Sequence, residues 1–112
     1  MRIDMHDIRR AAERNGSHWF EPGTMRFFRS RLAQVGYVSK QDDTVAYFVS
    51  SEQYVNAYSG TRCPRLYTVR RANLTTGDVG TVGEFQGFAS SSGANAAAKR
   101  YAEHGEPVAV PA

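Results

Sequence analysis

The spacing of apolar residues changes along the chain, and each spacing predicts a different kind of element. Near the N-terminus, Met5, Ile8 and Ala12 recur at the three- and four-residue intervals of one helix face. Asp4 precedes them as an N-cap, and the Asn-Gly of residues 15–17 offers a left-handed end. The pattern predicts a first helix that Asp4 caps and that stops at residues 15–17.

A second short helix is predicted from about Met25, after a Pro-Gly pair and a threonine N-cap. Met25, Phe28 and Leu32 would share its core face. The three arginines of this stretch, "TMRFFRSRL", would flank that face on both sides, and Phe27 would point away from it. This arrangement favours a packed helix with basic rims. Contact with a nucleic acid remains the alternative interpretation.

Further along, the apolar positions alternate with a period of two, which is typical of strands. The segments "QVGYVSK" and "TVAYFVSS", separated by "KQDD", predict a hairpin. The stretch "EQYVNAYSGTRCP" predicts a long loop held by Tyr54 and Tyr58. Beyond it, "RLYTVRRANL" and "VGTVGEFQGF" predict two more strands joined by the turn "TTGD".

The segment "ASSSGANAAAKRYAEHG" returns to helical spacing. Ala94, Ala97, Ala98 and Tyr101 fall on one face, and Gly105 ends the pattern. Small residues allow a helix to approach a sheet closely. The predicted order is therefore α-α-β-β-β-β-α. This is an α+β fold with an antiparallel sheet of three to four strands and helices on one face.

The chain has 112 residues, 41% of them apolar, which predicts one compact domain over residues 1–106 and a loose tail over 107–112. No apolar run approaches the roughly 20 residues that span a bilayer, and no signal-peptide pattern is present. We therefore expect a cytoplasmic protein that does not enter a membrane. Its oligomeric state is left open, with a homo-oligomer allowed.

The net charge of +3 is uneven, because residues 1–40 carry eight Lys or Arg against four Asp or Glu. Such an excess favours an anionic partner, although ordinary solubilisation explains it equally.

Catalytic signatures are scarce. His6, His18 and His104 lie far apart and lack metal-ligand spacing, so no metal or cofactor is expected. A single cysteine, Cys63, cannot form an internal disulfide or a cysteine-based zinc cluster. The glycines of "GDVGTVGEFQG" lack the spacing and the lysine of a phosphate loop. We predict a protein that is not an enzyme.

The third predicted strand carries Arg70 and Arg71 on opposite faces. If helices cover one face, one of the two arginines points outward and can contact phosphates; the alternative is a solvated outer face. Glu84, between apolar strand residues, is expected to pair with one of them across the hairpin.

The order of segments within residues 65–101 resembles the layout of plant AP2-type and phage-integrase arm-binding domains. The segments that carry this resemblance are "YTVRR…TTGDVGTVGEF…ANAAAKRYA". Those domains have a three-stranded sheet followed by one helix. The resemblance implies DNA contact by sheet arginines, here Arg70 and Arg71. The sheet tryptophans of that family are absent from this chain.

Four segments of the chain resemble a group of short uncharacterised proteins encoded by phages and plasmids. These segments are "TMRFFRSR", "YFVSSEQY", "RLYTVRRA" and "TVGEFQGF". This resemblance covers most of residues 19–101 and implies an accessory protein of a mobile element. It carries over no catalytic residues.

The leading functional hypothesis is therefore a non-enzymatic accessory protein that binds a host macromolecule, as a defence antagonist or regulator. One alternative is a DNA- or RNA-binding protein that uses a basic sheet face. Another is a sponge for an anionic nucleotide signal. Arginine and aromatic side chains supply the candidate contacts, which are Arg26, Phe27, Arg29, Arg31, Tyr54, Tyr58, Arg70 and Arg71.

Overall fold

A computed structural model describes residues 1–21, 25, 31–55 and 58–107. The first helix, α1 (Met5–Arg14), has the predicted limits. The Asp4 carboxylate accepts a hydrogen bond of 2.7 Å from the backbone N–H of His6, which caps the helix. The cap residue also ends a short strand, β1 (Arg2–Asp4), which the sequence analysis did not anticipate.

The described residues form one antiparallel sheet of six strands, rather than the predicted three to four. The strand order is β1-β3-β4-β5-β6, and β2 pairs with β4 beside β3. Strands as short as β1 and β2 are too short to show an alternation of apolar and polar residues, so the sequence did not predict them. The remaining bounds are β2 (Arg31–Leu32), β3 (Val35–Val38), β4 (Val45–Glu52), β5 (Leu66–Asn73) and β6 (Val79–Val82).

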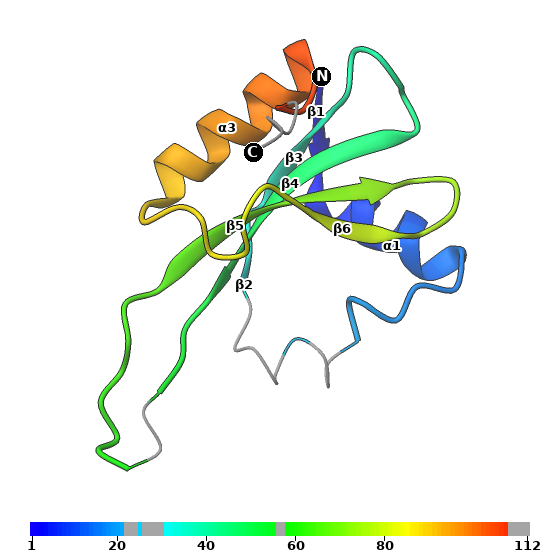
Figure 1. The fold of residues 1–112 in the computed structure, drawn as a ribbon. Helices are drawn as coiled ribbons and strands as arrows, with labels where there is room; N and C mark the ends of the chain where they lie inside the picture. Colours follow the sequence, from blue (N-terminus) through cyan, green and yellow to red (C-terminus); the bar gives the residue numbers. More distant parts are fainter. Residues whose placement is uncertain (22–24, 26–30, 56–57, 108–112) are drawn as a thin grey trace, which may run out of the picture.

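Helices α1 and α3 (Ser91–His104) cover opposite faces of the sheet, which corrects the expectation that the helices share one face (Figure 1). Ile8 of α1 packs with Phe20 and Phe48 on one face. On the other face, Val49 and Val69 pack against α3. Strand β4 is buried along nearly its whole length, so its apolar residues on both faces require two covering layers.

Helix α3 confirms the predicted C-terminal helix. Ser90 caps it by accepting from the backbone N–H of Gly93, and Gly105 follows its end. The alanines at 94, 97, 98 and 102 are buried against the sheet. Their small side chains let the helix lie close to β4 and β5.

The β4–β5 connection leaves the body of the molecule as a long extension (Figure 1). Its described residues, 53–55 and 58–65, are here called the arm. A bridge pairs Val55 with Arg62, and the backbone N–H of Cys63 donates to Tyr54 O at 2.8 Å. Tyr54 is 43% exposed and Tyr58 is fully exposed, so the expected anchoring of this segment by its tyrosines is wrong.

Two sequence predictions fall largely outside the described residues. Most of the predicted helix after Thr24 lies there with Arg26, Phe27 and Arg29, and so does most of the predicted tail. The end of that predicted helix is described and corrects the prediction, because Arg31 and Leu32 form strand β2. Among the helices that the structure describes, none has the length and apolarity needed to cross a membrane.

Candidate functional site

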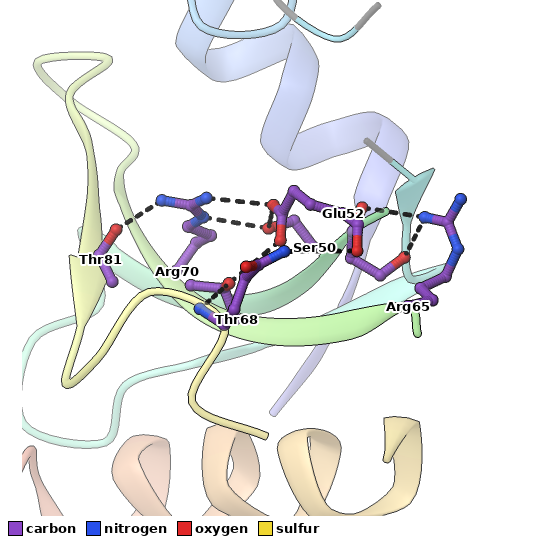
Figure 2. A network of polar contacts seen from close by, with 8 residues as sticks. Ser50, Glu52, Arg65, Thr68, Arg70 and Thr81 are labelled. Atoms are coloured by element: carbon purple, nitrogen blue, oxygen red, sulfur yellow. Dashed lines mark hydrogen bonds and ion pairs between the residues drawn. The ribbon is translucent and has the colours of Figure 1, made fainter. Parts of the chain in front are cut away.

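Arg70 belongs to a buried polar network on the α1 face of the sheet (Figure 2). Its Nη2 donates to Glu52 Oε1 at 3.1 Å, and its Nε donates to Ser50 Oγ at 3.0 Å. Ser50 Oγ in turn donates to Glu52 Oε1 at 2.8 Å, and Thr68 Oγ1 donates to Glu52 Oε2 at 3.2 Å. The carboxylate of Glu52 is completely buried, so its charge is neutralised only inside this network.

Aromatic rings complete the surroundings of Arg70. Its guanidinium carbon lies 5.3 Å from the ring centroids of both Trp19 and Phe85. Such stacking favours a guanidinium, whose charge faces the negative face of the ring. Only 11% of the Arg70 side chain is exposed, so the network orients Arg70 inward and joins β4, β5 and the segment around Phe85.

Arg71, on the α3 face, has a carboxylate partner of its own. Its Nη1 lies 2.6 Å from Glu106 Oε1 and 2.8 Å from Glu106 Oε2. The hydroxyl of Tyr47 donates to Glu106 Oε2 at 2.8 Å. Burial, followed by the hydrogen bond to Glu106, raises the pKa of Tyr47 to about 12. This cluster fastens the chain after α3 to the centre of the sheet.

Glu84 does not pair with either sheet arginine as predicted. It is exposed in the connection after β6, because that strand ends at Val82 and Gly83 adopts a left-handed conformation with φ of 76°. The sequence did contain a signal for Glu52, since Phe48, Ser50 and Glu52 alternate on one face of a strand opposite Arg70. The predicted strand "TVAYFVSS" ended at Ser51, so Glu52 was assigned to the loop that follows and was not considered as a partner of Arg70.

At the base of the arm, two arginines converge on Ser51. Arg31 lies directly opposite Ser51 in the β2–β4 register. Arg65 donates from Nη1 to Ser51 O at 3.1 Å and to Ser51 Oγ at 3.0 Å. Burial and then the like charge of Arg31 lower the pKa of the Arg65 guanidinium. Positive charge is therefore concentrated where the arm leaves the sheet.

The arm extends this basic character. Residues 53–77 contain no Asp or Glu, and residues 22–41 contain none either. Within the arm, Arg62 is exposed beside the exposed tyrosines. Cys63 is exposed as well. The arm thus presents arginine, tyrosine and hydroxyl groups without a carboxylate.

The structure divides the candidate contact residues into two groups. Arg31, Tyr54 and Tyr58 lie on the arm or at its base, whereas Arg70 and Arg71 are bound to carboxylates elsewhere on the sheet. Two residues of the arm region, Arg62 and Arg65, were not among the candidates. Their acid-free surroundings in the sequence were the signal that could have identified them.

The histidines are separated in space and make local contacts. His18 Nδ1 lies 2.6 Å from Glu21 Oε1, His6 Nε2 lies 2.8 Å from Arg10 Nη2, and both contacts are at the surface. In the part of the chain that the structure describes, no group of three or more His, Cys, Asp or Glu could hold a metal ion.

Comparison with known proteins identifies a family and nothing more specific. Residues 4–99 match the model described as "Family of unknown function (DUF7447)". The match covers most of the chain, so the protein belongs to this family. No curated protein and no solved structure matches the chain significantly. Because the family description names no function, the mobile-element and AP2-type resemblances stay predictions.

Proposed function

We propose that this chain is a non-enzymatic accessory protein that binds a macromolecule through the arm, and that its partner is a nucleic acid. The observation that carries this proposal is the projecting arm itself, with exposed Tyr54, Tyr58 and Arg62 and no carboxylate. The role in a mobile element follows the resemblance, as does the link to host defence or regulation.

Three physical properties of the arm support a nucleic-acid partner. Arginine guanidinium groups bind phosphate oxygens through charge-assisted hydrogen bonds. Tyrosine rings offer stacking platforms for unpaired bases, which tolerate any sequence. The arm also projects from the body of the molecule, so its exposed side chains are accessible to a large partner (Figure 1). An acid-free arm suits the negative potential near the phosphate backbone.

The sheet-face version of this hypothesis receives less support. Its two arginines are engaged with Glu52 and Glu106, and helices lie on both faces of the sheet. Releasing Arg70 to bind a phosphate would leave Glu52 buried without its counter-ion, at a cost of several kcal/mol. We therefore place the contact surface on the arm.

The test is fluorescence anisotropy with labelled single-stranded and duplex oligonucleotides at several salt concentrations. We expect Tyr58→Ala with Arg62→Ala to weaken binding at least tenfold, since a stacked base and a phosphate contact are both lost. Removal of Arg62 should also make the slope of log K against log salt less steep by about one.

The matched control is Lys99→Ala, which removes one positive charge from the exposed side of α3. Binding that survives in the arm variant, or that falls equally in the control, would contradict the arm as the contact surface. Absence of nucleic-acid binding, combined with capture of a defined protein that needs Tyr58 and Arg62, would make the partner a protein instead. Arginine and aromatic residues serve as anchors in protein interfaces too.

A further inference from the structure

A small cavity lies at the base of the arm, on the face of the sheet that α3 covers. Its volume is about 110 Å³, and the residues lining it include Arg31, Ser51, Tyr67 and Ser91. Arg31 is exposed and Tyr67 is half-buried, so the cavity is reached from the surface near the arm. Strands β2, β4 and β5 and the first residue of α3 all contribute to its wall.

Two guanidinium groups are directed to this place by the backbone. Arg31 and Ser51 are cross-strand partners, and such partners project from the same face of a sheet with Cβ atoms about 5 Å apart. Arg65 reaches the same serine through two hydrogen bonds from Nη1. The strand register places Arg31 beside Ser51, and hydrogen bonds hold Arg65 there, so the like charges of the two arginines repel each other.

Burial and the like charge of Arg31 lower the pKa of Arg65 more than the nearby carboxylate of Glu52, which attracts Arg65, raises it. Glu52 follows Ser51 in β4, so its side chain projects from the opposite face of the sheet. There, its two oxygens accept from Ser50, Thr68 and Arg70. The cavity is lined by Arg31 and by the hydroxyl-bearing residues Ser51 and Tyr67, and Arg65 is bound to Ser51 beside it. This chemistry is that of an anion site.

We propose that Arg31, Arg65 and Ser51 form a cleft that binds a phosphoryl group at the base of the arm. Two guanidinium forks can donate to several oxygens of one phosphate, and the anion would relieve the repulsion between them. The inference rests on the proposed function, in which this group is a backbone phosphate of the bound nucleic acid. A phosphate of a free small molecule would present the same chemistry.

The experiment measures the thermal unfolding midpoint and the binding isotherm of the full chain in inorganic phosphate, against sodium chloride at equal ionic strength. We expect phosphate to raise the midpoint of the native protein by binding the folded state. Arg31→Gln should weaken phosphate binding about tenfold or more, because one charge-assisted donor set is lost. Lys99→Gln, which removes one positive charge from the exposed side of α3, should leave phosphate binding unchanged.

Oligonucleotide binding by the same variants separates the two proposals. If Arg31→Gln weakens both phosphate and oligonucleotide binding, the cleft receives a backbone phosphate. If it weakens phosphate binding alone, the cleft stands as a site for a free phosphorylated molecule. Equal phosphate binding by Arg31→Gln and the native chain, or no stabilisation of the native chain by phosphate, would overturn the cleft. Loss of oligonucleotide binding on changing only Tyr58 and Arg62 would still support the arm.

The unfolding midpoints in chloride show whether a substitution itself lowers the stability of the protein. Arg31 is exposed, so its replacement should leave the midpoint in chloride close to that of the native chain. Arg31→Lys adds a second check, because a lysine keeps the charge but loses the planar fork. Phosphate binding intermediate between the native chain and Arg31→Gln is expected for this variant, and full native affinity would contradict the role of the fork.

Discussion

The arginines of β5 and those around the arm have opposite surroundings. Arg70 and Arg71 each contact a carboxylate, at 3.1 Å and 2.6 Å. The first ion pair joins β5 to β4, and the second ties β5 to the chain after α3. Among the described residues, Arg31 and Arg62 form no ion pair. The position of the acidic residues, rather than the number of arginines, therefore decides the role of each arginine. An arginine next to a carboxylate stabilises the fold, and an arginine outside an ion pair can contact a partner.

Removing the carboxylate of the buried pair is expected to have the largest effect on stability. Glu52→Ala leaves the mostly buried Arg70 without its counter-ion, which should lower the free energy of unfolding by about 3–5 kcal/mol. Urea unfolding followed by circular dichroism measures this loss. A loss below about 1 kcal/mol would contradict the structural role of the network.

A double variant sharpens that result. Replacing both charges, as in Glu52→Leu with Arg70→Met, should be less damaging than Glu52→Ala because no buried charge is left alone. If the double variant is the less stable protein, hydrogen bonds from Ser50 and Thr68 contribute more than the ion pair does.

Alkaline pH should weaken the cluster on the opposite face. The pKa of Tyr47 is raised from 10.0 to about 12, so the folded state holds this proton more tightly than the unfolded chain does. The stabilisation from this group is complete below about pH 10 and is lost as the pH rises toward 12. We expect about 1–2 kcal/mol of stability to disappear across that window.

Tyr47→Phe is the control for this titration, because it removes the ionising hydroxyl and keeps the ring. Unfolding free energies of both proteins, measured from pH 9 to pH 12, should fall less steeply in the variant. Parallel curves would mean that other groups account for the alkaline loss.

The smallest effect is expected at the partly exposed ion pair. Arg71→Ala should cost only about 0.5–1 kcal/mol, because solvent screens a pair whose side chains are 42% and 31% exposed. The unfolding midpoint in urea should shift accordingly, and the shift should shrink at high salt. A loss as large as that of Glu52→Ala would remove the distinction between the buried and the surface pair.

Several elements could be predicted from local signals alone. The limits of α1 follow from Asp4 and the Asn-Gly end, and those of α3 follow from Ser90 and Gly105. The β3–β4 hairpin follows from the alternation of its apolar residues. These signals lie within a few residues of the element that they define, so no knowledge of the fold is needed to read them.

The partners of the charged residues could not be found in the same way. Glu52 and Arg70 are 18 residues apart, and Arg71 and Glu106 are 35 residues apart. Each pairing depends on strand register and on where α3 ends, and both are set by the packing of the whole domain. The expected partner, Glu84, was adjacent in the predicted hairpin, but β6 ended before reaching it.

The sequence by itself determined the α+β class, the terminal helices with their caps and the acid-free stretches, because composition, periodicity and capping act locally. Only the tertiary structure decided that α1 and α3 lie on opposite faces, because this depends on which side of the assembled sheet each helix packs against. It also decided which arginines are neutralised and which surround the arm. Burial and strand register bring distant charges together, and neither is a property of any short segment.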